Sequence, residues 1–541
     1  MKIYSILAAA FFLAFFCTLH VSAQTPRSSR LFNVPPITIL NDENPTGGYL
    51  FLATLNFDNN TSKHLLILDE HGTVVFDREN PLGSKSNLAD FKSQPGNRYS
   101  FFDFSENAYI ILDKNFHTID TVRAVGYQTD NHELLIDEKN HYFLMGTEQR
   151  IINMADSIRG GNPSANVIGI VVQELDSEKN VVFEWKTLDH LPVTQSKGVD
   201  LASDQIDYIH TNSLWVDTDS TILLSNRHLN EITKVSTKTG HIVWRMGLNS
   251  SGNEFTFVND SLGFSYQHCV QRLPNGNIIL FDNGNYRRGS QFSRACEYKI
   301  DEEKKTATLV WQYRNSPDLF SAFMGSVQRL QNGNTLIGWG GATPSATEVD
   351  SLGNKVFECS FSTTVPEYSY RAFKFDIPNI DSLRSSRLVI PDSVAILSQN
   401  LQDILKEILG DSLFAQNSSI YFLTNIDSAT ATVAYRNPND FISYKTVTLL
   451  ENTVTSIRLD TAPPTETRVT IYPNPSTGDF KMNIINTEEA IPVAIYNSFG
   501  QLVIEKKVLE SDTFNNFPVG VYTMIVSLRH QNLRCKFVIT R

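Results

Sequence analysis

The chain has 541 residues, of which 41% are hydrophobic and 11% aromatic, and its formal net charge is −12. This length exceeds one ordinary hydrophobic core, and the apolar content excludes a largely disordered chain. The negative charge argues against sequence-independent binding to nucleic acid, which depends on patches of lysine and arginine.

The first 23 residues are typical of a secretory signal peptide. Lys2 precedes an apolar run at residues 6–16, and residues 21–23 (VSA) form an Ala-x-Ala-like cleavage site. The run is shorter than the roughly 20 residues that cross a bilayer, and no later run is longer. We therefore predict a signal peptide at residues 1–23 and no membrane span.

An internal repeat follows. Residues 270–279 (VQRLPNGNII) recur 57 positions later as residues 327–336 (VQRLQNGNTL), and His210 and His268 lie 58 positions apart. Short strands that alternate with Asn-Gly turns at such a period are typical of a β-propeller, whose blades begin at a central channel. We mark six unit starts, at Gly48, Asn97, His132, His210, His268 and Gly325. The prediction is a six-bladed propeller over residues 24–378.

Two details refine this prediction. Arg294-Ala295 recurs as Arg371-Ala372, which places the end of the last blade near Phe375. The long third unit contains a turn-rich loop at residues 156–164, which could cover one mouth of the channel.

Beyond residue 378 the repeat stops. Residues 379–460 are predicted to form a small accessory module without an assigned role, and residues 461–466 (TAPPTE) have the composition of a linker. From composition and turn spacing, residues 467–541 are predicted to form a seven-stranded β-sandwich. The predicted fold class is therefore all-β, with helix-like apolar spacing only at residues 397–409 of the accessory module.

Three blocks in residues 467–541 carry a resemblance. In order they are residues 471–478 (IYPNPSTG), 495–503 (IYNSFGQLV) and 517–524 (FPVGVYTM). Together they resemble the type A C-terminal sorting domain of the type IX secretion system of Bacteroidetes. The resemblance implies that the secretion machinery is a partner, and that the chain passes through the periplasm and outer membrane to be secreted or attached to the cell surface.

A second resemblance lies in the repeat region. Residues 207–213 (DYIHTNS), 267–268 (QH), 281–285 (FDNGN) and 293–295 (SRA) together resemble the arylsulfotransferase family. That family is a six-bladed propeller that transfers a sulfuryl group from a phenolic sulfate ester to another phenol, through a sulfated histidine and without a nucleotide cofactor. The resemblance matches His210 and His268 to the first two channel histidines, and Arg287 or Arg288 to the channel arginine.

These residue types suit that chemistry. Imidazolium N–H groups and a guanidinium fork donate hydrogen bonds to sulfate-ester oxygens, and a neutral imidazole is a good nucleophile. The family's sulfated histidine has no match, because Gly325 and Ser326 occupy the repeat-equivalent place. The available substitutes are His132 and His228. Further ligand-binding roles are predicted for the following residues: His132, Asn212, Asn283 and Ser326.

Other interpretations stay open. Each histidine could instead hold blade geometry by bonding to nearby turns. His132, His210 and His268 could form a three-histidine zinc site, but no glutamate base is in register and no metal is predicted. The chain could also be a non-catalytic secreted or surface propeller that binds a glycan, a peptide or a small ligand. Enzymatic activity is therefore left open at this point.

Overall fold

The computed structural model describes residues 34–56, 62–80, 87–361, 366–378, 380–384, 393–396, 420–427, 430–437, 439–451, 468–472, 479–485, 490–497, 501–509, 511–527 and 532–539. The chain divides into two compact units. One contains residues 1–389, 419–425 and 432–446, and the other contains residues 390–418, 426–431 and 447–541. The predicted signal peptide and linker lie outside the described residues.

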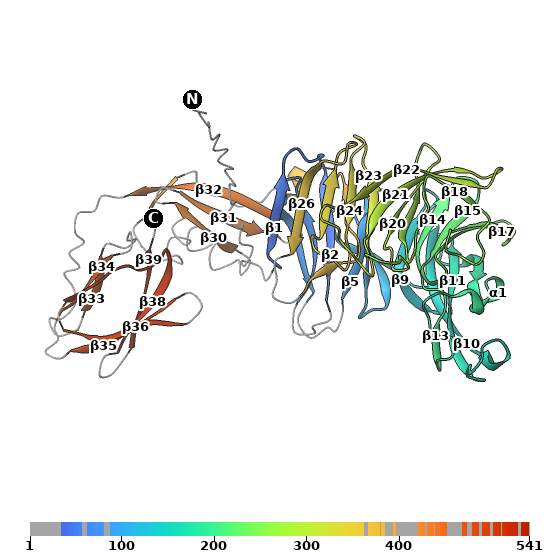
Figure 1. Ribbon diagram of the computed structural model, residues 1–541. Helices are drawn as coiled ribbons and strands as arrows, with labels where there is room; N and C mark the ends of the chain where they lie inside the picture. Colours follow the sequence, from blue (N-terminus) through green and yellow to red (C-terminus); the bar gives the residue numbers. More distant parts are fainter. Residues whose placement is uncertain are drawn as a thin grey trace, which may run out of the picture. The chain divides into compact units, whose positions relative to one another are not determined.

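Six sheets in the described part of the first unit are the blades of a β-propeller (Figure 1). The first blade contains β27 (Tyr368–Ser369), β28 (Phe373–Phe375), β2 (Tyr49–Leu55), β3 (Lys63–Leu68) and β4 (Val74–Asn80). The second contains β5 (Leu88–Gln94), β6 (Arg98–Asp103), β7 (Ala108–Leu112) and β8 (Thr118–Val122). The third contains β9 (Gln128–Ile136), β10 (Tyr142–Ile152), β11 (Ala165–Leu175), β12 (Val181–Lys186) and β13 (Gln205–Asp207).

The fourth blade contains β14 (Thr211–Asp217), β15 (Thr221–Asn226), β16 (Glu231–Ser236) and β17 (Ile242–Met246). The fifth contains β19 (His268–Arg272), β20 (Ile278–Asp282), β21 (Arg294–Asp301), β22 (Thr306–Arg314) and β18 (Thr256–Val258). The sixth contains β23 (Ser326–Arg329), β24 (Thr335–Gly338), β25 (Ala346–Val349), β26 (Lys355–Phe361) and β1 (Ile37–Asp42). Short helices occur at η1 (Met154–Asp156), α1 (Thr187–His190), η2 (Val193–Gln195), η3 (Arg227–Leu229) and α2 (Ile380–Arg384).

The inner strands of the blades form a closed cycle. β28, β5, β9, β14, β19 and β23 each contact the next strand in this order, and β23 contacts β28 again. Both ends of the repeat region take part in the closure. β1, near the N-terminal end, adds an outer strand to the sixth blade, and β28, near the C-terminal end, supplies the inner strand of the first.

Each pair of neighbouring blades encloses its own apolar core, which explains the apolar runs in the sequence. Successive side chains of a strand point to opposite faces of its sheet. Ile278 therefore packs in the core with the fourth blade, and Ile279 packs in the core with the sixth. Leu223 and Leu224 divide in the same way between the fifth and third blades. Since both faces of a blade are covered by its neighbours, middle strands such as β7 and β20 are buried at every position, whereas the outer strands β8 and β12 are partly exposed.

The predicted number of blades is confirmed, but two unit starts were wrong. Gly48 and Asn97 precede β2 and β6, which are second strands of their blades. Residues 368–375 supply the missing inner strand of the first blade, so the sixth blade ends at Phe361 and not near Phe375. In the second blade, the inner strand β5 contains a bulge at Asp90, whose φ is +53°. The bulge interrupts the regular alternation of side chains, so the sequence pattern did not identify this strand.

A sheet follows the propeller in the chain. It contains β29 (Ser393–Ile396), β32 (Ile442–Glu451), β31 (Thr430–Arg436) and β30 (Ile420–Asp427). Residues 432–446 belong to the propeller unit. Phe441 packs with Phe76 and Phe116 in the core between the first two blades, and Arg436 pairs with the buried Asp77. The predicted domain boundaries around residues 378 and 460 remain predictions.

The last strands form two facing sheets. One contains β33 (Arg468–Tyr472), β34 (Phe480–Ile485) and β37 (Ser511–Phe514), and the other contains β36 (Leu502–Val508), β35 (Ile491–Asn497), β38 (Gly520–Ser527) and β39 (Asn532–Ile539). Phe480 of the first sheet and Met524 and Phe537 of the second share one buried core, so the predicted sandwich is confirmed. Within the described residues, no helix is long and apolar enough to span a membrane.

Candidate active site

His210 stands at the entry to the inner strand β14. The chain leaves β13 at Asp207 and turns at His210, whose φ of +49° is unusual for a residue with a side chain. The turn brings Nδ1 of His210 to 2.5 Å from Oδ2 of Asp207. Because Nδ1–H donates to the carboxylate, the lone pair of the imidazole is on Nε2. The side chain is 32% exposed, and among the described residues nothing bonds to Nε2.

His132 forms a second pair of the same kind on the neighbouring blade. It lies in β9 where the register with β10 shifts, and its Nδ1 is 2.8 Å from Oδ1 of Asp130. Its ring centroid is 5.0 Å from that of His210, edge to face. No other bond of its ring occurs within the described part of the chain, and its side chain is 13% exposed. Two Asp–His pairs therefore face one another.

His228 lies beside His210 but has no free nitrogen. Its Nδ1–H donates to the main-chain oxygen of Asp207 at 2.7 Å, and its Nε2 accepts from Nη1 of Arg227 at 2.6 Å. Burial and the neighbouring His210 lower the pKa of His228 to about 4, so it is neutral near pH 7. Burial alone would raise the pKa of Asp207, but the hydrogen bond from His210 and the charges of His210, His228 and His132 together outweigh it, and that pKa is lowered.

Arg227 is a half-buried cation without a carboxylate. Its guanidinium lies 4.1 Å from the ring centroid of Tyr266, and Nη2 donates to the main-chain oxygen of Ala322 at 3.1 Å. It forms no ion pair with any described residue. Burial lowers its pKa, but an arginine remains charged at neutral pH. A half-buried guanidinium without a carboxylate partner can bind an anion.

Tyr266 and His228, which contact this cation, belong to a row of six rings. Neighbouring centroids are 5.0–5.9 Å apart in the order Tyr286, Tyr266, His228, His210, His132, Tyr370. Tyr286 is 43% exposed, and Tyr266 is buried, with its hydroxyl donating to the oxygen of Lys197 at 2.9 Å. The row therefore leads from the surface past Arg227 to the two Asp–His pairs.

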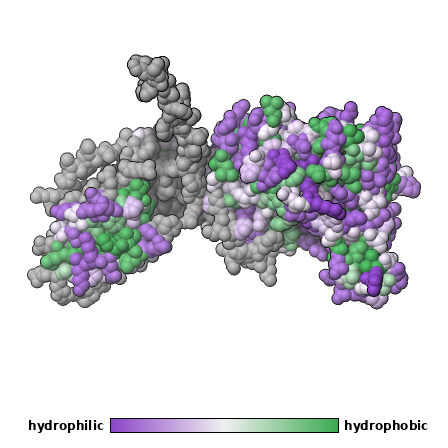
Figure 2. Space-filling view, viewed as in Figure 1, coloured by the Kyte–Doolittle hydropathy of each residue, from purple (hydrophilic) through white to green (hydrophobic). Residues whose placement is uncertain are grey.

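The hairpin of β10 and β11 stands at the same end of the propeller. The first residues of β11 pair with β13, which leads to His210 within three residues. The end of the hairpin projects beyond the neighbouring strands (Figure 1), and Figure 2 shows apolar residues there; Ile151 is 69% exposed. The predicted loop at residues 156–164 lies at this end of the hairpin, after η1. Its role as a cover stays a prediction.

His268, the first residue of β19, lies beside the same cluster with both nitrogens engaged. Nδ1–H faces Oδ1 of Asn283 at 2.7 Å and the oxygen of Tyr266 at 3.0 Å, and Nε2 accepts from the backbone N–H of Met324 at 3.2 Å. Burial, with Arg227 nearby, holds the pKa of His268 well below its usual value. Asn283 in turn donates to the oxygens of Ser321 and Met324.

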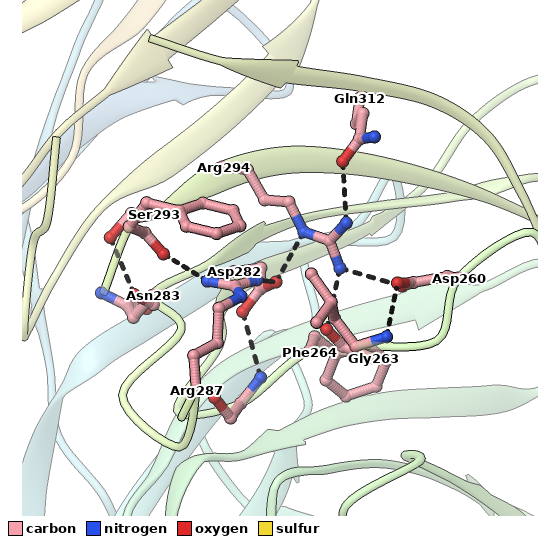
Figure 3. A network of polar contacts seen from close by, with 12 residues as sticks. Asp260, Gly263, Phe264, Asp282, Asn283, Arg287, Ser293, Arg294 and Gln312 are labelled. Atoms are coloured by element: carbon pink, nitrogen blue, oxygen red, sulfur yellow. Dashed lines mark hydrogen bonds and ion pairs between the residues drawn. The ribbon is translucent and has the colours of Figure 1, made fainter. Parts of the chain in front are cut away.

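Neither arginine predicted from the sequence contacts the histidine cluster among the described residues. Figure 3 shows Arg287 folded against its own turn, where it bonds to Asp282 and to the oxygen of Phe292. Asp282 also accepts from Arg294 at 2.9 Å, and Arg294 reaches Asp260 at 2.9 Å. Arg288 is exposed on the following turn. The guanidinium at the cluster is Arg227, which the sequence analysis had not singled out.

The remaining predicted positions are the following: Asn212, Gly325 and Ser326. Asn212 donates to the oxygen of Gln267 at 2.8 Å, and its buried Oδ1 has no partner among the described residues. The Ser326 hydroxyl bonds to both the N–H and the oxygen of Ala372, at 2.9 and 3.0 Å. A Cβ on Gly325 would lie 2.4 Å from the ring of Phe281, so no side chain fits there.

A metal ion is not favoured at this cluster. Among the described residues, the donor atoms of Asp207, His210 and His228 lie within 4.8 Å of one another, a different set from the three histidines considered above. The Arg227 guanidinium is 2.6 Å from Nε2 of His228 and would repel a cation. The Nδ1 atoms of His210 and His228 also face hydrogen-bond acceptors that hold them as N–H donors.

The fold and the site define a six-bladed propeller with histidines and an arginine at one end of its inner strands. The family model described as Arylsulfotransferase (ASST) matches residues 37–371. The chain therefore belongs to the arylsulfotransferase family. A second model, Secretion system C-terminal sorting domain, matches residues 470–540. This type IX sorting domain indicates export to the cell surface or secretion. The signal peptide and a source among the Bacteroidetes stay predictions.

Two curated relatives are both called arylsulfate sulfotransferase AssT. The protein of Escherichia coli O6:H1 is 27% identical over 168 residues, which covers 25% of this chain and 28% of the relative. The protein of Lelliottia amnigena is 28% identical over 166 residues, with coverage of 25% and 28%. The chain thus spans about 28% of the length of the curated relatives it matches.

Similarity to solved structures is weak. A protein of unknown function from Bacteroides caccae aligns with a TM-score of 0.38 at 10% identity, over 60% of this chain and 98% of that chain. A streptogramin B lyase aligns with a TM-score of 0.34 at 9% identity, over 60% and 87%. Scores at this level carry no argument about function.

Proposed function

We propose that this exported protein transfers a sulfuryl group from aryl sulfate esters to phenols, at the end of the propeller that carries Arg227, His210 and His132. The nonbridging oxygens of the ester bind the Arg227 guanidinium. The aryl group lies against the row of rings, and His210 presents its Nε2 to the sulfur. This arrangement needs no cofactor.

One observation carries the proposal. Arg227 has no carboxylate partner among the described residues, whereas Arg287, Arg294 and Arg371 are each held by a buried aspartate. A guanidinium in a partly desolvated site binds anions strongly, because few water molecules compete for its donors. The ring of His210 lies 5.1 Å from that of His228, which Arg227 contacts, and its side chain is 32% exposed, so the proposal puts an anion bound at Arg227 within reach of a nucleophile.

The test uses para-nitrophenyl sulfate, whose release of nitrophenol is visible by absorbance. The full chain should release nitrophenol faster when a phenol is added as acceptor. Arg227→Ala should lower kcat/KM by about 10²–10³-fold, as loss of one charge-stabilising donor does. Arg227→Lys, which keeps the charge but not the fork, should lose less. Arg123→Ala, at an exposed pair with Glu106, is the matched control and should change nothing. Full activity of Arg227→Ala would contradict the proposal.

One observation favours a second function. Gly325 and Ser326 stand at the repeat-equivalent place where we expected the sulfated histidine from the resemblance, and the Ser326 hydroxyl bonds to the backbone of Ala372. A propeller without that histidine could bind an aryl sulfate, a glycan or a peptide without turning it over. Binding of para-nitrophenyl sulfate by calorimetry, lost in Arg227→Ala and accompanied by no release of nitrophenol, would favour this function.

A further inference from the structure

The backbone of one loop lies against the outer end of the row of rings. The N–H of Lys197 donates to the oxygen of His228 at 2.6 Å, and the Tyr266 hydroxyl donates to the oxygen of Lys197 at 2.9 Å. A Cβ on the next residue, Gly198, would lie 2.1 Å from the Tyr266 hydroxyl oxygen and 3.3 Å from Cε2 of Tyr286. The bare backbone at Gly198 therefore packs against both tyrosines and supports the ring of Tyr286 on one side.

Tyr286 and His210 are the most exposed rings of this row. The exposed fraction is 43% for Tyr286 and 32% for the side chain of His210, whereas Tyr266 and His228 between them are buried. The Arg227 guanidinium contacts these two buried rings, so the exposed rings stand on opposite sides of it. An aryl sulfate whose oxygens bind Arg227 and whose sulfur faces His210 is left with Tyr286 as the exposed ring for its aryl group.

The spacing of the row sets the size of aryl group that reaches Tyr286. From His210 to Tyr286 there are three steps between neighbouring ring centroids, each of 5.1–5.9 Å. A single benzene ring is shorter than one of these steps, so the phenyl group of an ester bound at Arg227 does not extend to Tyr286. Two fused or linked rings cover the additional step, and the second ring can pack against Tyr286 in an offset or edge-to-face arrangement.

We propose that Tyr286 is a specificity-determining residue that binds the second ring of a two-ring aryl sulfate. This inference rests on the proposed function, and within it on the binding of the ester oxygens at Arg227. It adds the substrate class: sulfate esters of phenols with two fused or linked rings bind more tightly than esters of single-ring phenols. Tyr286 contacts neither the sulfur nor the phenolic oxygen, so it stabilises the bound ester and the transition state equally. Its contribution is therefore to KM and not to kcat.

Two donors whose phenols have similar acidity test the role of Tyr286. They are para-nitrophenyl sulfate, with one ring, and methylumbelliferyl sulfate, with two fused rings. Tyr286→Ala should raise KM for methylumbelliferyl sulfate by about 3–10-fold, as loss of an aromatic pair does, and should change KM for para-nitrophenyl sulfate far less. Tyr286→Phe keeps the ring and should restore the preference for the two-ring donor, because the Tyr286 hydroxyl has no partner among the described residues. Val243→Ala, at a side chain that is also 43% exposed, is the matched control.

The outcomes separate this inference from the proposed function. An equal rise in KM for both donors in Tyr286→Ala, or no rise for either, would overturn the inference and leave the proposed function intact. A loss of kcat with both donors and a lower urea midpoint would mean that Tyr286 is structural, and would also overturn it. If the wild-type chain releases neither phenol, the proposed function is refuted, and calorimetry decides the inference. Methylumbelliferyl sulfate should then bind more tightly than para-nitrophenyl sulfate to the wild-type chain alone of the wild type and Tyr286→Ala, and equal affinities would overturn the inference.

Discussion

The ring of Phe281 occupies the space that a side chain on Gly325 would need. The two residues come from adjacent blades, and an added Cβ would lie 2.4 Å from Cδ1 of the ring. Gly325 also has a φ of +114°, which strongly favours glycine. A histidine at position 325, where the repeat led us to look for the sulfated residue, is therefore excluded by the φ of Gly325 and by the ring of Phe281.

Gly325→His should accordingly destabilise the propeller by about 2 kcal/mol or more and should not increase sulfuryl transfer. Urea unfolding measures the loss. Gly126→His is the matched control, because Gly126 has a φ of +81° but nothing within 4 Å of an added Cβ. An equal loss in the two variants would show that strain in φ accounts for everything and that the contact with Phe281 does not matter.

Arg287 is predicted to act on stability. Its side chain is 5% exposed and pairs with the fully buried Asp282. Arg287→Ala leaves that carboxylate with one of its two arginines and with the backbone N–H of Ser265, and breaking a buried pair costs about 3–5 kcal/mol when one partner is removed. Arg288→Ala, on the exposed part of the same turn, should have no effect. A stable Arg287→Ala variant with impaired transfer would instead return this arginine to the site.

Stability should fall in mild acid. The pKa of His228 is lowered from 6.5 to about 4 in the folded chain, so the unfolded chain binds this proton more readily. The resulting stability is complete above about pH 6.5 and is lost progressively as the pH falls towards about 4. Buried His268 acts in the same direction. Urea unfolding at about pH 7.5 and about pH 5 should show this slope, with a smaller slope in His228→Gln. His117→Gln, at an exposed site, should leave the slope unchanged.

Residues beyond the repeat region should stabilise the propeller. Phe441 is fully buried against Phe76 and Phe116, and Phe441→Ala should lower the free energy of unfolding by about 3–5 kcal/mol. Val310→Ala, at a side chain that is 48% exposed, is the control. If Phe441→Ala is as stable as the control, residues 432–446 contribute nothing to the free energy of unfolding of the propeller, and the prediction is wrong.

The blade count and the sandwich could be predicted because both depend on local patterns. Asn-Gly turns and apolar strands mark each hairpin, so the repeat of residues 270–279 at residues 327–336 was enough to find the period. The closure of the ring could not be predicted. β28 pairs with β2, which is more than 300 residues away in the sequence, and no turn or repeat motif near either strand indicates that pairing.

The site was predictable in part, for a similar reason. His210 stands at an inner strand, as the period indicated, and His132, which we marked as a unit start 78 residues earlier, also lies on one; their rings face one another. Arg227 was missed because the resemblance was matched to Arg287 or Arg288. A sequence also does not tell which arginines have a carboxylate partner. One signal was available in the sequence. Arg227 and His228 directly follow β15, whose last residue, Asn226, pairs with Thr211 next to His210, so they lie at the same end of the blade as His210.

The most direct test of the account is to identify the residue that receives the sulfuryl group. The full chain is mixed with para-nitrophenyl sulfate without acceptor, quenched, digested and mapped by mass spectrometry under conditions that keep N-sulfation intact. The account predicts a burst of nitrophenol with a sulfuryl adduct on His210, both absent in His210→Gln. Steady release of nitrophenol with no adduct, or an adduct on another residue, would contradict it.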